Sequence, residues 1–186
     1  MLSVIGIALR TVLLLIASVV LGLSVTLARH QVTGEVPPQT AFGTFVGAAG
    51  FFASVIGMAA LWFDSISGKG LLGLDAVVSI FHLAAAISLT VALRNVSSCT
   101  AMDQESQYDR YYNKILNGGC VEIEKSPPFC YALGSDGKDL TPSRCLTAQA
   151  DYVFEYIGFI FGIAMVCLGY VLCRRGRGGT TDTNMI

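Results

Sequence analysis

The chain has 186 residues and a formal net charge of −1; 53% of its residues are hydrophobic and only 13% are Asp, Glu, Lys or Arg. A soluble domain is typically about one quarter charged, so this composition excludes a single soluble domain, and the high apolar content excludes a disordered chain. The small net charge also argues against a nucleic-acid-binding protein.

The apolar residues gather in four segments that carry only three charged residues between them. The segments cover residues 5–28, 41–63, 71–93 and 152–173, and the three charges are Arg10, Asp75 and Glu155. Each segment exceeds the ~20 residues that a helix needs to cross a bilayer, and none alternates polar and apolar residues as a membrane barrel strand does. We therefore predict an all-α integral membrane protein, a bundle of four transmembrane helices that forms a single domain over residues 1–186.

The first segment, 5–28, could also be the apolar core of a cleaved secretory signal, with Thr26-Leu27-Ala28 as its small-residue site. Apolar residues already precede Arg10, however, and the apolar run exceeds the usual length of a signal core. We therefore expect this segment to remain as the first span. Arg10 would lie ~8 Å below the membrane surface, given the helical rise of 1.5 Å per residue.

Small residues line the second and fourth segments. Gly43 and Gly47 form a Gly-x3-Gly pair, and Gly158 and Gly162 form another. Such pairs let helix backbones approach closely. Two uses stay open at this stage: packing inside the bundle, and lateral association with other membrane proteins through the same faces.

The third segment holds Asp75 near its start and His82 near the middle of the membrane. Asp75 and Arg10 would lie at matching depths, so they could form an ion pair between helices. Alternatively, Arg10 could reach the lipid headgroups while Asp75 faces the helix dipole. We expect His82 to be neutral and hydrogen-bonded between helices, in preference to a proton path through Asp75 and His82. With Glu155 near the far interface, the sequence suggests no charged path across the membrane.

The 94–151 loop between the third and fourth helices contains four of the six cysteines: Cys99, Cys120, Cys130 and Cys145. Their spacing does not fit a zinc site, and an even set in one loop favours two disulfides, with three pairings open. Aromatic and aliphatic residues in this loop also recur at helical spacing and stop at Gly118-Gly119. These residues, Tyr108, Tyr111, Tyr112, Ile115 and Leu116, predict an amphipathic helix that packs on the membrane domain or on the loop itself.

Basic residues predict the orientation. Arg174, Arg175 and Arg177 follow the last segment directly, and Lys69 lies in the 64–70 connection. Positive residues favour the cytoplasmic side, so both termini and the 174–186 tail are expected there. The 94–151 loop would then be extracellular or luminal. Cys173, next to the arginines, is a candidate for palmitoylation.

Two stretches resemble fungal MARVEL-domain proteins. Residues 74–86, with Asp75 ahead of an aromatic and small-residue run, are similar to the third span of that family. Residues 143–154, where Arg144-Cys145 leads into Ala, Asp and aromatics, are similar to the entry into the fourth. The resemblance implies a tetraspan protein of membrane organisation, trafficking or non-classical export at the plasma membrane. The cysteine-rich loop departs from the family; it is closer to the tetraspanin plan, but the tetraspanin Cys-Cys-Gly motif is missing.

No Gly-x-Ser-x-Gly, His-x3-His or phosphate-binding glycine loop occurs in the sequence. We therefore expect a non-enzymatic membrane organiser without cofactor, catalytic or metal site, whose partners are lipids, other membrane proteins or further copies of the chain. The alternatives are a small channel or transporter with a path through Asp75 and His82, and an accessory subunit of a larger membrane complex.

Overall fold

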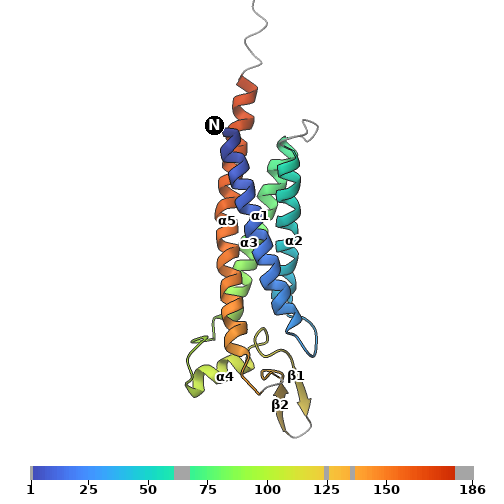
Figure 1. The fold of residues 1–186 in the computed structure, drawn as a ribbon, viewed down its shortest axis with the longest axis vertical. Helices are drawn as coiled ribbons and strands as arrows, with labels where there is room; N and C mark the ends of the chain where they lie inside the picture. The colour runs from blue at the N-terminus through green and yellow to red at the C-terminus, as the bar shows by residue number, and fades with distance from the viewer. Residues whose placement is uncertain (1, 61–67, 124–125, 135–136, 179–186) are drawn as a thin grey trace, which may run out of the picture.

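Four long helices run side by side in the computed structural model, which describes residues 2–60, 68–123, 126–134 and 137–178 (Figure 1). They are α1 (Leu2–Arg29), α2 (Pro38–Ala59), α3 (Gly68–Leu93) and α5 (Thr141–Gly178). All four are long and apolar enough to cross a membrane, which confirms the four predicted spans. The N-terminus and the far end of α5 lie at one end of the bundle, here named the tail end.

The helices form a ring in which α1 packs against α2 and α5, and α3 packs against the same two helices. Their buried positions alternate steps of three and four residues, as in left-handed helix bundles. On α5 these positions are Arg144, Ala148, Asp151, Glu155, Gly158, Gly162 and Met165. Large apolar side chains such as Phe52 and Ile160 are exposed on the outside of the ring, where lipid would cover them.

Several predicted boundaries need correction. α2 begins at Pro38 because proline is favoured in the first turn of a helix. α2 ends at Ala59 and α3 begins at Gly68, not at 71; residues 61–67, which include most of the predicted 64–70 connection, lie outside the described part. α5 begins at Thr141, not at 152, and continues to Gly178. The described end of the predicted 174–186 tail is therefore helical.

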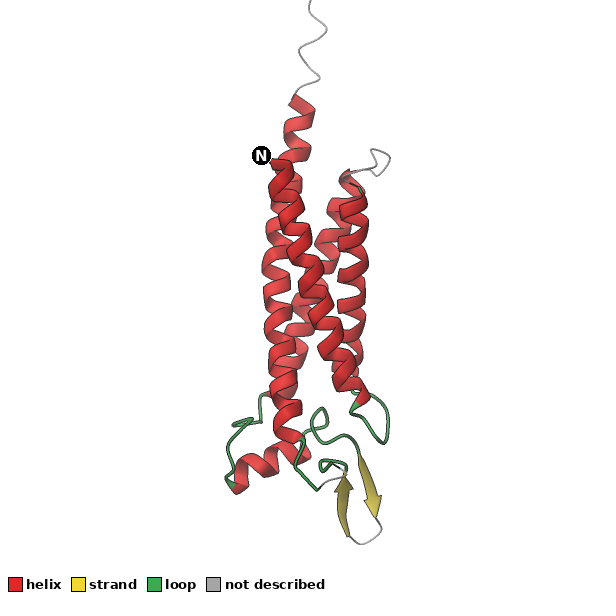
Figure 2. Cartoon of the chain, viewed as in Figure 1, coloured by secondary structure: helices red, strands yellow, loops and turns green. Residues whose placement is uncertain are grey.

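The segment between α3 and α5, residues 94–140, forms a folded cap over the end of the bundle opposite the tail end. It contains α4 (Gln104–Tyr112) and an antiparallel hairpin of β1 (Cys120–Ile123) and β2 (Ser126–Cys130) (Figure 2). The all-α prediction is therefore wrong for the cap.

The helix predicted in the loop exists but is shorter than expected. The Asp103 carboxylate accepts a hydrogen bond from the backbone N of Ser106, which starts α4 as an N-cap. The chain leaves the helix at Asn113, whose side chain accepts a bond from the backbone N of Ile115 and donates one to the carbonyl of Ala92. Ile115 and Leu116 consequently lie beyond the helix.

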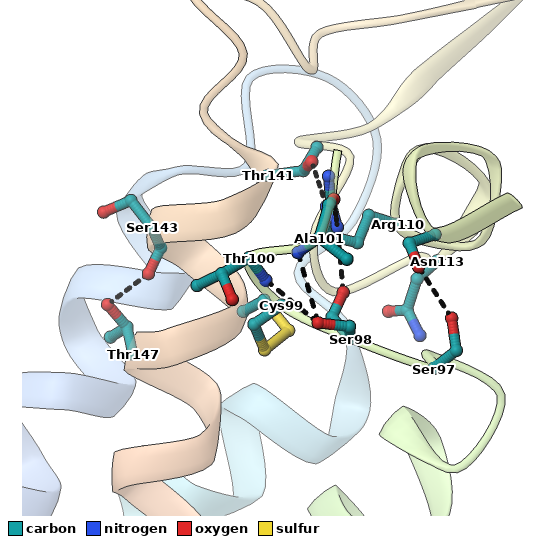
Figure 3. The surroundings of a disulfide bond; sticks show 12 residues. Ser97, Ser98, Cys99, Thr100, Ala101, Arg110, Asn113, Thr141, Ser143 and Thr147 are labelled. Carbon is teal, nitrogen blue, oxygen red and sulfur yellow. Dashed lines mark hydrogen bonds between the residues drawn. A yellow bond between two sulfur atoms is a disulfide. The ribbon is translucent and has the colours of Figure 1, made fainter. Parts of the chain in front are cut away.

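Two disulfides close the cap, Cys99–Cys145 and Cys120–Cys130. The first links the segment after α3 to the first turns of α5 (Figure 3), and the second joins opposite residues of the hairpin. Apolar residues surround the first disulfide and seal the cap to the bundle. This junction core consists of Leu27, Leu89, Leu93, Cys99, Ile115, Leu116, Cys145 and Ala148.

Two buried arginines hold the cap from inside. Arg110 donates to the carbonyls of Ser98 and Ala101, at 2.8 and 3.0 Å, and to the Thr141 hydroxyl. Arg144 donates to the carbonyls of Leu116 and Tyr131, at 2.9 and 3.1 Å. Because these two guanidinium groups donate to carbonyls of the cap and to Thr141, they hold segments of the cap that are distant in sequence against the start of α5.

The 30–37 connection joins the cap through Val32, whose backbone N donates to the carbonyl of Gly118 at 2.8 Å. A Cβ atom at Gly118 would lie 2.7 Å from Arg144 Nη1 and 3.1 Å from the carbonyl oxygen of His30, and φ there is +73°. Glycine is required at this position on both grounds.

The attachment of the 30–37 connection to the cap should weaken at acidic pH. Burial of the His30 imidazole, together with the nearby Arg144 guanidinium, lowers the pKa of His30 below its usual value. The unfolded chain therefore takes up this proton first, and the contribution of His30 to stability falls as pH drops below about 6.5. The unfolding midpoint of wild type should therefore fall relative to that of His30→Gln as the pH is lowered from about 7.5 to 5.5. A constant difference would show that His30 plays no part.

Candidate functional site in the bundle and the cap

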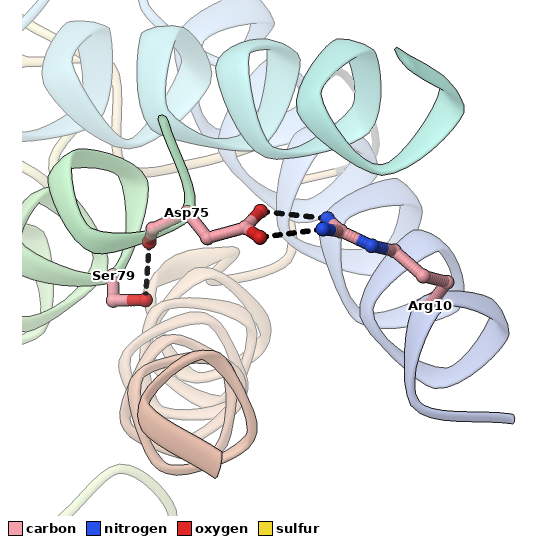
Figure 4. Close-up of polar contacts among 3 residues, drawn as sticks. All are labelled: Arg10, Asp75 and Ser79. Atoms are coloured by element: carbon pink, nitrogen blue, oxygen red, sulfur yellow. Dashed lines mark hydrogen bonds and ion pairs between the residues drawn. The ribbon is translucent and has the colours of Figure 1, made fainter. Parts of the chain in front are cut away.

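An ion pair between α1 and α3 lies inside the bundle toward the tail end (Figure 4). Arg10 donates from Nη1 to Asp75 Oδ1 at 2.6 Å and from Nη2 to Asp75 Oδ2 at 2.5 Å. Both residues are buried, and the Ser79 hydroxyl donates to the backbone carbonyl of Asp75. A Cβ atom at Gly57 of α2 would overlap the guanidinium. The sequence left open whether Arg10 and Asp75 pair with each other or are satisfied separately, and the geometry is that of the ion pair.

His82 lies deeper in the bundle, between two glycines. A Cβ atom at Gly50 of α2 would lie 3.0 Å from Nε2, and one at Gly158 of α5 would lie 3.1 Å from Nδ1. Nδ1 has no hydrogen-bond partner in the described ranges. Arg10, Asp75 and His82 also line a cavity of about 20 Å³, which is enough for a single water molecule.

The glycine pairs of α2 and α5 point into the bundle. A Cβ atom added at Gly43 would lie 2.6 Å from the Ser24 hydroxyl oxygen, and one added at Gly47 would lie 2.7 Å from the backbone N of Leu21. At Gly158 it would meet the His82 ring, and at Gly162 it would overlap the Ser79 hydroxyl. Of the two uses that the sequence left open for these faces, the geometry is that of packing inside the bundle, because helices of the same chain cover them.

Gly47→Leu should therefore destabilise the protein itself. The added side chain meets the backbone of α1, which cannot rotate away, and we expect a loss of about 3 kcal/mol in the free energy of unfolding. Unfolding in mixed micelles measures this loss. The matched control is Gly22→Leu on α1, because a Cβ atom at Gly22 has no atom within 4 Å. Equal effects of the two substitutions would contradict the packing.

Sequence reasoning missed the interior acids near the cap. Asp151, which was assigned to the loop, and Glu155, which was expected near the interface, are both 0% exposed. The Ser24 hydroxyl donates to Asp151 Oδ2 at 2.6 Å. The sequence did contain a signal for this burial, since Asp151, Glu155, Gly158 and Gly162 are separated by alternating steps of four and three residues and therefore share one face of the helix. His82 is consequently not alone in the interior: ionisable side chains follow one another from Asp75 to Asp151.

A cleft of about 850 Å³ opens on the cap, between the 31–39 segment and α4. Its lining includes the rings of Tyr108 and Tyr112, whose centroids are 4.4 Å apart, together with Glu35 and Lys114. Tyr108 and Tyr112 are exposed, 62% and 44%, while the Tyr111 hydroxyl accepts a bond from the backbone N of Cys130. Only Tyr111 of the three therefore has the structural role expected of the aromatic residues.

These features define a four-span membrane protein with a buried polar interior and a disulfide-closed cap. Residues 3–168 match the MARVEL membrane-associating domain, so the chain belongs to that family, and the match runs from α1 into the second half of α5. No curated protein and no solved structure gives a significant match.

Proposed function

We propose that the protein is a non-enzymatic organiser of membranes, acting in lateral microdomains, trafficking or the scaffolding of partner proteins. The membrane-associating family supports a role at the membrane. The observation that carries the proposal is how the surface is divided. The polar and small-residue faces of the helices are used within the bundle, whereas the cleft on the cap is open. Recognition is therefore assigned to the cap.

We further propose that the cap is extracellular or luminal and that the termini are cytoplasmic, at the plasma membrane, as in the fungal branch that the sequence resembles. The two cap disulfides favour an oxidising side, and Arg174, Arg175 and Arg177 favour the cytoplasm for the tail end. Cys173, half-buried on α5, remains the candidate for palmitoylation. Protease or antibody access to tags in 135–136 and after 186, in intact cells, tests this orientation.

The proposed role of the cleft in recognition is tested by removing the aromatic rings of Tyr108 and Tyr112. In cells that express fluorescently tagged protein, the double variant Tyr108→Ala/Tyr112→Ala should reduce lateral clustering severalfold, because both aromatic rings line the cleft and are exposed. Met102→Ala is the control, since Met102 is 77% exposed on the cap but does not line the cleft. Clustering that falls equally in both variants, or in neither, would remove the cleft from the proposal.

A channel or transporter is the second candidate, and the buried ionisable groups from Asp75 to Asp151 are the observation that favours it. The purified chain in liposomes separates the two functions. A proton or ion flux that is lost in Asp75→Asn, with the bundle still folded, would support the second candidate. An accessory subunit of a larger complex is distinguished by a stoichiometric partner after mild-detergent purification.

A further inference from the structure

Four polar side chains from three helices meet inside the bundle, next to the junction core. They are Ser24 of α1, Thr40 of α2, and Asp151 and Glu155 of α5, and none is more than 1% exposed. The Ser24 hydroxyl bonds to Asp151 Oδ2. A Cβ atom at Gly43 would lie 2.6 Å from Ser24 Oγ and 3.3 Å from Glu155 Oε1, so both oxygens lie beside the same glycine. Thr40 lies one turn earlier on the buried face of α2.

The cluster also holds every buried side-chain oxygen that lacks a hydrogen-bond partner in the described ranges. These oxygens are Thr40 Oγ1, Asp151 Oδ1, Glu155 Oε1 and Glu155 Oε2. Native proteins leave few such atoms, and three of the four belong to the carboxyl groups of Asp151 and Glu155, one turn apart on α5, which indicates that these groups bind something other than neighbouring side chains. Water would donate hydrogen bonds to these oxygens, but only a proton or a cation would also offset the negative charge of two carboxylates.

The surrounding helices offer no counter-charge. α2 contains no Asp, Glu, Lys, Arg or His at all, and the charged residues of α1 are Arg10 and Arg29, of which Arg29 is exposed. The charged or titratable residues of α3, which packs against α5, are Lys69, Asp75 and His82. Arg10 is paired with Asp75 of α3, far along the bundle. On α5, Arg144 is two turns from Asp151 and donates to cap carbonyls. Two adjacent carboxylates would therefore stand uncompensated in a medium of low dielectric, a strongly unfavourable state that carboxyl groups avoid by taking up protons.

We propose that Asp151 and Glu155 form a proton-binding site within the membrane, in which Glu155 is held as a neutral carboxylic acid at neutral pH. Binding transfers one proton from a hydronium ion to a carboxylate oxygen: an O–H bond of hydronium breaks, a carboxyl O–H bond forms, and a neutral water molecule is released. A metal ion is the less suitable occupant, because no group of three His, Cys, Asp or Glu in the described ranges could hold one. His82, a further titratable group, lies against Gly158, one turn of α5 from Glu155.

Infrared spectroscopy of the full chain in lipid vesicles tests the site, because the C=O stretch of a protonated carboxyl group is separate from the carboxylate bands. Wild type should show this band at neutral pH, with the small shift in heavy water that an exchangeable proton gives. Glu155→Gln should abolish all or most of it. The matched control is Glu122→Gln, at an exposed glutamate of β1, which should leave the band unchanged.

Spectra in sodium chloride and in choline chloride identify the ion. An equal band in both salts supports the proton, whereas a band that disappears in sodium would assign the cluster to a metal cation and overturn the proposal. Identical spectra of wild type and Glu155→Gln would overturn it as well. Should Glu155→Gln fail to fold, Asp151→Asn provides the second test: its neutral amide replaces the carboxyl bonded to Ser24, so it should change the frequency of the Glu155 band, and an unchanged band would contradict the shared site.

Discussion

Asp75→Asn is expected to lower the free energy of unfolding by about 3–5 kcal/mol, the range found when one partner of a buried ion pair is removed. The substitution leaves the Arg10 guanidinium 2% exposed and without its two charged hydrogen bonds. Gly57 of α2 lies directly against the guanidinium, so the guanidinium cannot reach bulk water without displacing a helix. Reversible unfolding in mixed micelles measures the loss.

The double variant Arg10→Met/Asp75→Leu is the control for this prediction. Apolar side chains of similar size replace both charges, and such replacements are often neutral, so most of the lost stability should return. If Asp75→Asn costs less than about 1 kcal/mol, as an exposed pair would, the pair does not hold α1 to α3.

Loss of the Cys99–Cys145 disulfide should be the other large effect. The bond closes a loop of 46 residues, for which the chain-entropy relation gives about 4 kcal/mol of stabilisation. Alanine at both positions fits the apolar junction core, so the double variant Cys99→Ala/Cys145→Ala isolates the cross-link. The cap should then unfold before the helices, and hydrogen exchange should show faster exchange at Arg110 and Leu116 than at the midpoints of α1 and α3.

The second disulfide and a free cysteine provide the comparison. Cys120–Cys130 closes only 10 residues, and the same relation gives about 3 kcal/mol, confined to the hairpin. Cys167 is free and exposed, so Cys167→Ala should leave both the cap and the bundle unchanged. Uniform exchange in the cap of Cys99→Ala/Cys145→Ala and of wild type would show that the arginine contacts hold the cap without the disulfide.

The four spans could be predicted from sequence because hydropathy and length directly report the solvent around a helix. The start of α5 at Thr141 could not, since residues 141–151 are mostly polar and are helical where Arg144 and Cys145 bind the cap. Asp151 was assigned to the loop for the same reason. The burial of Glu155 depends on which face of α5 meets α1 and α2, and only the packed bundle determines that.

The cap shows the same limit. Its four cysteines predicted two disulfides, but the pairing depends on contacts between the start of α5 and the segment after α3. The hairpin was missed because β2 contains Pro127 and Pro128, and proline is depleted in strands. Both strands of a two-stranded sheet are edge strands, where proline is tolerated. The Arg10–Asp75 pair was foreseeable as a hypothesis from matching depth, whereas its enclosure by Gly57 required the structure.

We propose that lateral association uses the cap cleft and not the helix faces. The most direct test compares clustering of Tyr108→Ala/Tyr112→Ala with that of Phe45→Ala/Phe52→Ala on the outer face of α2, where Phe45 and Phe52 are 55% and 64% exposed. Single-molecule tracking of both variants in the same membrane gives the fraction of slow, clustered molecules. We predict a severalfold decrease for the cap variant and wild-type clustering for the α2 variant. A decrease in the α2 variant alone would contradict the role of the cleft.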